Sequence, residues 1–305
     1  MTRKRRRILL FISIVLFMVL VAPVLLYSFG YRFSTETWQI VRAGGFSISS
    51  TPSTGTQIYL DGKLAKKTSL LSRRLFIQGL TPHAYKIRIE KDGYFPWEKT
   101  LPVYPERVTD IQALLVRDGP EGTVLLHGDW QKFSFLGESR IILKLFDSKN
   151  RSSSFSLTDL TLTSNSSASA TTTSVLPDEV KKILAEKKPI DYDYDSTSER
   201  IIWWDKRTLS IRWLKGEEFL PLYTETSEEI IFRASDAIRN ASFYPGQDAI
   251  LLASSNAVMV VELDGRGQRN TYPLYKGREP RFLVSPDDNK VYILDDGNLI
   301  AIPLT

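Results

Sequence analysis

The sequence predicts a chain that is all-β apart from one N-terminal transmembrane helix, with a small β-sandwich followed by a β-propeller-like domain. Three observations predict this fold class. Residues 8–29 carry no charged side chain, and residues 44–117 combine alternating strands with two-residue turn signals. A strand–turn–strand pattern then recurs four times within residues 123–305.

The first 29 residues predict a membrane anchor. A basic tail, residues 1–7, precedes an uncharged run from Ile8 to Phe29. At about 1.5 Å per residue, a helix of that length crosses a hydrocarbon layer of about 30 Å. The basic tail places the N-terminus on the cytoplasmic side, so the bulk of the chain is expected to be extracytoplasmic. The alternative is a cleaved signal peptide, although these usually have shorter apolar cores and end at an A-x-A-like site, which residues 27–30 lack.

Residues 30–43 are expected to link the span to the outer domains. Several aromatic side chains lie where a membrane interface would be, and an interfacial aromatic belt is the expected arrangement. These residues are Tyr27, Phe29, Tyr31, Phe33 and Trp38.

The charge balance argues against a nucleic-acid partner. The chain has 40 basic and 35 acidic residues, and five of the basic residues lie in the N-terminal tail. The outer part is therefore balanced, and the basic excess acts as an orientation signal. The absence of cysteine excludes disulfides and a lipoprotein anchor, and in an exported protein it indicates a bacterial setting.

Residues 44–117 predict a small β-sandwich of about five strands. Phe46 and Ile48 alternate with serines, and Ile87 and Ile89 with charged residues, which is the period of a half-buried strand. Asp61-Gly62 and Asp92-Gly93 predict type I′ turns, since glycine adopts positive φ without strain. A basic cluster surrounds the first hairpin and indicates either a charged edge strand or a contact with an acidic polymer or lipid headgroups. It consists of Lys63, Lys66, Lys67, Arg73 and Arg74.

The same region resembles the PEGA family of small surface-associated β-domains. The matching segments are Ser50-Thr51-Pro52, Tyr59 to Gly62, Leu80-Thr81-Pro82, Lys91 to Tyr94, and Phe95-Pro96-Trp97. The four-residue signature of the family is degenerate here as Pro52-Ser53-Thr54-Gly55, the glycine usual after the loop proline is His83, and Thr68-Ser69 replaces Thr-Pro. The resemblance implies a non-catalytic β-sandwich of cell-envelope proteins, with no ligand or catalytic residue common to the family.

Beyond a candidate boundary at residues 118–122, four copies of one pattern predict propeller blades. The copies start at Phe133, Tyr192, Ala241 and Arg281. Their equivalent marks, Ile141, Ile201, Ile250 and Val291, are 60, 49 and 41 residues apart. Propeller blades recur every ~40–50 residues. A second β-sandwich or a partial β-meander is the alternative.

The long first interval contains two further segments. The Ser- and Thr-rich residues 152–174 predict a flexible insertion. Residues 177–188, with acidic side chains early and lysines late, predict a short amphipathic helix.

No recognisable catalytic or metal motif is present, so neither catalysis, a cofactor nor a metal is expected. The two histidines, His83 and His127, are too few for a zinc site. Asp191, Asp193 and Asp195 imitate the start of a calcium loop, but Ser196 and Ile202 occupy the positions that need glycine and a bidentate carboxylate.

Aromatic residues are the candidate ligand contacts. Trp203 and Trp204 are consecutive, so in a strand they point to opposite faces and one of them is free to face solvent. Indole rings stack well on the apolar face of a sugar, and Tyr192 and Tyr194 could extend such a surface. Packing between blades is the alternative.

Together these features predict a non-catalytic, membrane-anchored, extracytoplasmic binding or scaffolding protein of the bacterial cell envelope. Its expected partners are the membrane and a glycan, a cell-wall polymer or an envelope protein, recognised through loops of the β-domains. Two alternatives stay open: a sensor that acts through a membrane partner, and a polysaccharide or peptide hydrolase with an unrecognised carboxylate pair.

Overall fold

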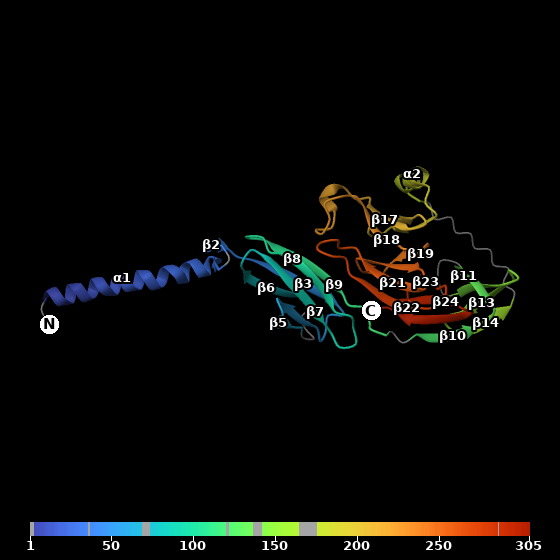
Figure 1. Cartoon of the computed structure of the whole chain (residues 1–305), viewed down its shortest axis with the longest axis horizontal. Coiled ribbons are helices and arrows are strands. Elements are labelled where there is room, and N and C mark those ends of the chain that lie inside the picture. The colour runs from blue at the N-terminus through green and yellow to red at the C-terminus, as the bar shows by residue number, and fades with distance from the viewer. Residues whose placement is uncertain are drawn as a thin grey trace. The chain divides into compact units, whose positions relative to one another are not determined.

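The computed structural model (Figure 1) describes residues 3–35, 37–68, 74–119, 122–136, 142–164, 176–285 and 287–305. The chain folds into two compact units. The first unit consists of Met1–Ile89 and Glu98–Ala113, and the second of Glu90–Trp97 and Leu114–Thr305.

A long apolar helix, α1 (Arg3–Ser28), opens the first unit. Its segment Arg5–Ser28 is 24 residues long and contains an 18-residue window with a mean hydropathy of 3.1, none of whose residues is buried. The predicted span from Ile8 to Phe29 ends one residue beyond this helix. Length and composition suit either a membrane anchor or a signal sequence.

The segment expected to be a linker forms a hairpin. Strands β1 (Tyr31–Ser34) and β2 (Gln39–Arg42) pair in antiparallel register. The rings of Phe33 and Trp38 meet edge to face, with centroids 5.9 Å apart. Both side chains stay exposed, at 54% and 78% of their surface.

Seven further strands form a β-sandwich, two more than the sequence predicts. A three-stranded sheet has the order β6-β3-β9 and a four-stranded sheet the order β5-β4-β7-β8. The bounds are β3 Gly44–Thr51, β4 Gln57–Leu60, β5 Lys63–Lys67, β6 Arg74–Leu80, β7 Ala84–Glu90, β8 Trp97–Pro102 and β9 Val108–Leu114. In β7, buried Tyr85, Ile87 and Ile89 alternate with polar residues, as the period-two pattern predicts.

The type I′ prediction is confirmed at one of the two turns and is wrong at the other. Asp61 and Gly62 both have positive φ, 48° and 78°, so the turn between β4 and β5 fits the prediction. At Asp92-Gly93 only the glycine has positive φ, and the Tyr94 N–H donates to the Lys91 carbonyl over 3.1 Å. The type I′ prediction is therefore wrong there, because that type needs positive φ at both central residues.

The basic cluster lies on an edge strand. All five residues of β5 are exposed, and β5 is the outermost strand of its sheet. The expected edge position is confirmed for the three lysines of β5, and lysines on an open edge discourage pairing with another chain. Arg73 lies outside the described residues.

The second unit contains four four-stranded antiparallel sheets (Figure 1). The first sheet has the order β11-β12-β13-β14, the second β15-β16-β17-β18, the third β19-β20-β21-β22 and the fourth β10-β25-β24-β23. Strand bounds in the first two sheets are β11 Trp130–Leu136, β12 Ile142–Asp147, β13 Ser152–Ser156, β14 Thr161–Ser164, β15 Asp191–Asp195, β16 Arg200–Trp204, β17 Thr208–Trp213 and β18 Glu228–Arg233. Those in the other two are β19 Ile238–Phe243, β20 Ala249–Ser254, β21 Ala257–Glu262, β22 Thr271–Lys276, β23 Arg281–Ser285, β24 Lys290–Asp295, β25 Asn298–Pro303 and β10 Thr123–His127.

The arrangement is β-propeller-like. The fourth sheet takes its outer strand β10 from the start of the unit, where Val124 pairs with Ile300 of the last strand, β25. Hydrophobic clusters join the second sheet to the third, the third to the fourth and the fourth to the first. Among the described residues, no such cluster joins the first sheet to the second.

The repeated sequence pattern corresponds to the first two strands of each sheet. Ile201, Ile250 and Val291 lie in β16, β20 and β24, while Ile141 lies outside the described residues. In the first three sheets the outermost strand follows a loop of different length, and in the fourth sheet it comes from the start of the unit, which is why the pattern did not reveal it.

The prediction of a flexible insertion is wrong for part of its segment. Residues 152–174 were expected to be flexible, yet β13 and β14 lie in the first half of this segment and complete the first sheet. Serines and threonines pair there through backbone hydrogen bonds, and Phe155 is buried. Residues 165–174 lie outside the described residues. The predicted short helix is confirmed as α2, Asp178–Lys187.

Candidate functional site

The innermost strands of all four sheets line an open cavity of about 390 Å³, which we call the axial cavity. Strands β11, β15, β19 and β23 contribute to its wall, together with the end of β16. The lining residues are Phe135, Asp191, Tyr192, Asp193, Trp204, Asn240, Ala241, Ser242, Phe282, Leu283 and Val284. A cavity of this size lies within the range of roughly 300–1,000 Å³ that small-molecule sites occupy.

Of the two carboxylates in the axial cavity, one is engaged with the neighbouring sheet and the other is open. Asp193 accepts hydrogen bonds from the Ser242 hydroxyl over 2.7 Å and from the Phe243 N–H over 3.0 Å. It thereby joins β15 to β19. Asp191 is exposed, and its one hydrogen bond within the described residues comes from the N–H of its neighbour Tyr192, at 3.0 Å. Asp191 therefore retains lone pairs for a ligand.

Two buried polar atoms at the axial cavity lack partners in the described part of the chain. They are the indole Nε1 of Trp204 and the side-chain oxygen of Asn240. The amide nitrogen of Asn240 donates to the Phe282 carbonyl over 2.9 Å, which fixes the orientation of this side chain. Both atoms have almost no accessible surface, and leaving such a group unsatisfied costs about 1–3 kcal/mol.

The structure separates the two tryptophans that the sequence analysis singled out. Trp204 is 2% exposed, packs between the second and third sheets and lines the axial cavity. Trp203 is 7% exposed and packs against Val180 and Ile183 of α2. The expectation that one of them is free to face solvent is wrong, because α2 covers the outer face of the second sheet.

The two candidate tyrosines share one face of β15, as their spacing predicts. Tyr192 and Tyr194 both pack against the cluster of Trp203 and α2. Tyr192 also lines the axial cavity, whereas Tyr194 does not. Of the four candidate aromatic residues, the cavity thus brings together Trp204 and Tyr192.

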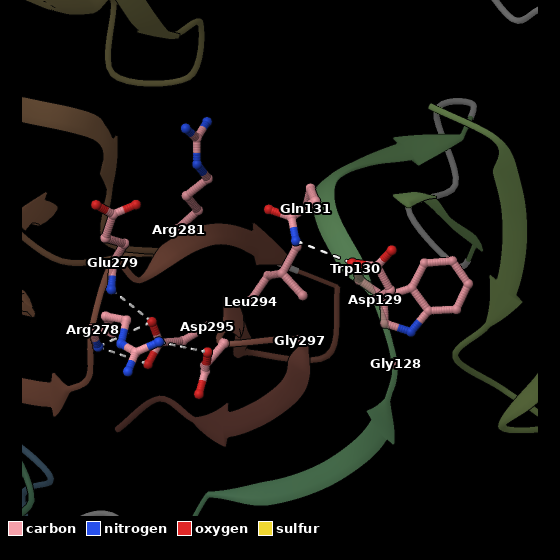
Figure 2. A pocket seen from close by; sticks show the side chains of 11 residues that line it. Gly128, Asp129, Trp130, Gln131, Arg278, Glu279, Arg281, Leu294, Asp295 and Gly297 are labelled. Carbon is pink, nitrogen blue, oxygen red and sulfur yellow. Dashed lines mark hydrogen bonds and ion pairs between the residues drawn. The ribbon is translucent and has the colours of Figure 1, made fainter. Parts of the chain in front are cut away.

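A second cavity, which we call the rim cavity, has a volume of about 360 Å³. Figure 2 shows the loops that enclose it, and its lining residues are Gly128 to Gln131, Arg278, Glu279, Arg281 and Leu294 to Gly297. The carboxylate of Asp295 accepts hydrogen bonds from the N–H groups of Arg278 and Glu279 at 3.0 and 2.8 Å. Asp295 therefore shapes this loop.

Asp295 also holds a tyrosine beside the rim cavity. The Tyr275 hydroxyl donates to Asp295 over 3.0 Å. Burial and this hydrogen bond to a carboxylate raise the pKa of Tyr275 to about 12. The phenol consequently stays protonated at physiological pH and serves as a fixed donor.

The acidic and histidine residues considered as metal ligands lie apart. Asp195 forms an ion pair with Arg200 over 3.0 Å, and Asp193 bonds to Ser242. His127 contacts Asn298 in the second unit, while His83 packs on Tyr85 in the first. Within the described ranges, no group of three or more His, Cys, Asp or Glu side chains is placed to hold a metal ion.

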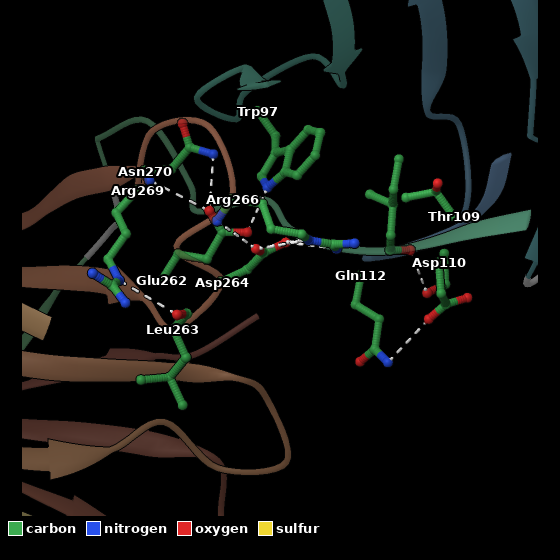
Figure 3. A network of polar contacts seen from close by, with 12 residues as sticks. Trp97, Thr109, Asp110, Gln112, Glu262, Leu263, Asp264, Arg266, Arg269 and Asn270 are labelled. Carbon is green, nitrogen blue, oxygen red and sulfur yellow. Dashed lines mark hydrogen bonds and ion pairs between the residues drawn. The ribbon is translucent and has the colours of Figure 1, made fainter. Parts of the chain in front are cut away.

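A polar network in the second unit involves a segment from the predicted sandwich. The Trp97 indole donates to Glu262 over 2.9 Å, as Figure 3 shows. Glu262 is 5% exposed and also accepts from the Asn270 side chain over 3.0 Å. Phe95 stacks on Tyr272, whose hydroxyl donates to the Pro96 carbonyl over 3.2 Å. These interactions explain why Glu90–Trp97 belongs to the second unit.

Comparison with known families identifies the first domain. Residues 43–118 match the PEGA domain, as the turn segments of the sequence predict. The chain thus carries a PEGA domain behind an N-terminal apolar helix. None of the curated proteins compared with it matches.

Solved structures show only a distant likeness. An auxiliary nutrient binding protein from Bacteroides thetaiotaomicron is 11% identical with a TM-score of 0.24, and the match covers 79% of this chain and 57% of that one. A putative phosphatase from the same organism is 10% identical with a TM-score of 0.26, covering 79% and 60%. The AfRom2 CNH domain is 13% identical with a TM-score of 0.25, covering 79% and 66%. This chain thus spans less than two thirds of these structures, and its fold is established by its own strand pairing.

Proposed function

We propose that this protein is a non-catalytic binding protein of the bacterial cell envelope, anchored by α1, that holds a sugar unit of a glycan in the axial cavity. The observation that carries the proposal is the pair of unpartnered buried atoms, Trp204 Nε1 and Asn240 Oδ1, at a cavity of about 390 Å³. A sugar hydroxyl can accept from the indole and donate to the amide oxygen. Asp191 offers a further acceptor, and the partly exposed Phe135 and Leu283 offer apolar surface to the ring.

The proposal includes a closed ring of four blades. The pairing of β10 with β25 supports it, because this pairing joins the beginning and the end of the second unit. The convergence of the four innermost strands on one cavity supports it as well. In propellers such a central channel is a common place for ligands, since loops and strand edges from every blade meet there.

The anchoring and the location form the second part of the proposal. The helix α1 exposes its apolar side chains throughout, as a membrane-spanning helix does in lipid. Its N-terminal basic residues favour a cytoplasmic N-terminus. The PEGA domain supports an extracytoplasmic position for the two units' β-domains.

A binding panel tests this function. The full chain in phosphatidylcholine nanodiscs is titrated with neutral hexose, N-acetylhexosamine and uronic acid oligosaccharides. We expect at least one to bind saturably. The Trp204→Phe variant should lose about tenfold in affinity, because it removes the indole donor but keeps an aromatic ring.

The matched control is Trp213→Phe. Trp213 lies in the same hydrophobic cluster, and its indole nitrogen is also buried without a described partner, but it does not line the axial cavity. Equal weakening by both substitutions, or no saturable binding to any saccharide, would contradict the proposal.

One observation favours hydrolysis as a second candidate function. Asp191 and Asp193 both line the axial cavity and, two residues apart in β15, lie on the same face of the strand. Two carboxylates about 5–10 Å apart are what glycoside hydrolysis requires. Release of reducing sugar from a bound oligosaccharide, lost in Asp191→Asn, would favour this alternative. Binding without turnover favours the non-catalytic proposal.

A further inference from the structure

Two arginines lie at or near the start of neighbouring innermost strands, β19 and β23, which both line the axial cavity. Arg239 directly precedes Asn240 in β19, and Arg281 directly precedes Phe282 in β23. Arg239 Nε donates to the Pro280 carbonyl over 3.1 Å, and the Asn240 amide to the Phe282 carbonyl over 2.9 Å. The two strands therefore run side by side in the same direction. Both arginines consequently lie toward the same end of two strands that line the axial cavity.

The Arg239 side chain is held in place by backbone carbonyls. Besides Pro280, it donates to the carbonyl of Ser255. Burial lowers the pKa of Arg239, and the neighbouring Arg281 lowers it too, while the charges of Glu279, Asp295 and Asp236 act in the opposite direction. Among the described residues, no carboxylate forms an ion pair with Arg239. A partly buried guanidinium without a direct counter-ion favours an anion beside it.

Arg281 is the exposed member of the pair. Figure 2 shows its side chain pointing to the same side of β23 as Glu279, away from Asp295, at the rim cavity. In the described part of the chain, Arg281 forms neither a hydrogen bond nor an ion pair. Asp295, the buried carboxylate at the end of β24, already accepts hydrogen bonds from the N–H groups of Arg278 and Glu279. Arg281 is therefore available to a ligand.

We propose that Arg239 and Arg281 together bind an acidic group, a carboxylate or a phosphate, on the glycan whose sugar unit occupies the axial cavity. The proposal rests on the proposed function and narrows its substrate class to anionic glycans. Guanidinium groups suit this role because their N–H fork matches both carboxylate and phosphate oxygens. An anion between two like charges also relieves the repulsion between them.

The test compares ligands that differ only in charge. The full chain in phosphatidylcholine nanodiscs is titrated with trigalacturonic acid and with its neutral methyl ester. We expect the acid to bind at least tenfold more tightly at low ionic strength, and this advantage to shrink as salt is added. A trimer of glycerol phosphate serves as the second probe, and whichever probe depends on the two arginines identifies the acidic group as carboxylate or phosphate.

Substitutions assign the effect to the two residues. Arg281→Gln and Arg239→Gln should each remove most of the acid's advantage and leave binding of the methyl ester unchanged. Arg233→Gln is the control, because Arg233 is exposed on the outer strand of the second sheet and carries the same charge. If Arg239→Gln unfolds the protein, the exposed Arg281 still provides the test.

The outcomes separate this inference from the proposed function. If the methyl ester binds with dependence on Trp204 but neither acidic probe binds more tightly, the inference is wrong and the proposed function stands. An advantage that persists in Arg281→Gln would also overturn the inference. If no saccharide binds, acidic or neutral, the proposed function itself fails.

Discussion

At the scale of single residues, Trp203 and Trp204 show how one strand serves two purposes. They are adjacent in β16 and both nearly buried, yet they belong to different clusters. Trp204 faces the third sheet and the axial cavity, and Trp203 faces α2. The helix α2 packs on the second sheet through this cluster. Among the described residues, no hydrophobic cluster joins the second sheet to the first. Trp204 thus belongs to the proposed binding site, whereas Trp203 has a packing role.

Truncation of Trp203 should therefore affect stability alone. We expect Trp203→Ala to lower the free energy of unfolding by about 3–5 kcal/mol, the usual cost of removing a buried aromatic ring. Urea denaturation followed by circular dichroism measures this cost. Folded Trp203→Ala protein should still bind the saccharide that Trp204 recognises. Loss of binding with unchanged stability would contradict the assignment.

A buried arginine joins two sheets of the second unit. Arg200 is 5% exposed and donates to Asp195 over 3.0 Å and to Asp248 over 2.8 Å. Asp195 ends β15, whereas Asp248 precedes β20 in the next sheet. Burial raises the pKa of Asp195, but hydrogen bonds from Ser198 and the charge of Arg200 outweigh it, so the pKa is lowered overall.

This pair predicts a pH-dependent stability. Because the folded-state pKa of Asp195 is lowered, its contribution is present above the unfolded value of about 3.9 and is lost as pH falls through the folded value. Arg200→Met should cost about 3 kcal/mol at pH 7, the low end for a broken buried pair, since both aspartates keep some solvent contact. Urea titrations from pH 7 to pH 3 should show this difference shrinking below about pH 4. A difference that is constant with pH would contradict the ion pair.

At the scale of elements, the sequence predicted the strands that have a periodic hydrophobic pattern. It did not predict the strands whose pairing does not depend on apolar side chains. The alternating residues of β3, β4 and β7 and the buried second strands β16, β20 and β24 follow from their hydrophobic pattern. Strand β13 was missed because its residues are serines around Phe155, and β14 because it is short and polar. Which strands β13 and β14 pair with depends on how the whole sheet folds, and their own sequences do not indicate it.

Of the candidate site, the sequence predicted two residues that line the axial cavity, Trp204 and Tyr192. Asn240, Arg239 and Arg281 were not predicted to be ligand contacts, because nothing in their local pattern distinguishes them from ordinary strand residues. Their role depends on four innermost strands, far apart in sequence, that converge on one cavity. Only the observation that β19 and β23 each carry an arginine near their start could have pointed to the pair.

The pairing of β10 with β25 can be tested by a crosslink. Val124 and Ile300 are direct partners in this ladder, and the chain contains no native cysteine. We expect a Val124→Cys, Ile300→Cys double variant to form a disulfide on mild oxidation and to gain about 2–4 kcal/mol over its reduced form. The two single variants serve as controls. A folded double variant that stays reduced would contradict the closed ring.

The β1–β2 hairpin provides a test at the membrane. Phe33, Trp38 and Ile40 are exposed immediately after the apolar helix, where interfacial aromatic residues gather in membrane proteins. We expect brominated phosphatidylcholine to quench part of the tryptophan fluorescence of the full chain in vesicles. Trp38→Phe should abolish this part, whereas Trp213→Phe should leave it unchanged. Equal quenching in wild type and Trp38→Phe would show that the hairpin stands clear of the lipid.

At the scale of the whole molecule, each part supplies one physical requirement of the tethered binding protein that we propose. An apolar helix can hold the chain at a membrane, the PEGA domain comes next along the chain, and the propeller-like unit presents a cavity made by all four of its sheets. The outer part carries equal numbers of basic and acidic side chains, so its net charge does not select a ligand. The local arrangement of side chains therefore determines which ligand binds. The paired arginines of β19 and β23 are one such local feature.

An experimental structure of the full chain with a saccharide from the binding panel would examine the proposed site itself. We expect density for a sugar unit inside the axial cavity, within hydrogen-bonding distance of both Trp204 Nε1 and Asn240 Oδ1. An acidic group of the same ligand should lie against Arg239 and Arg281. A saccharide bound elsewhere on the chain, with the axial cavity filled by side chains or water, would contradict the proposed function.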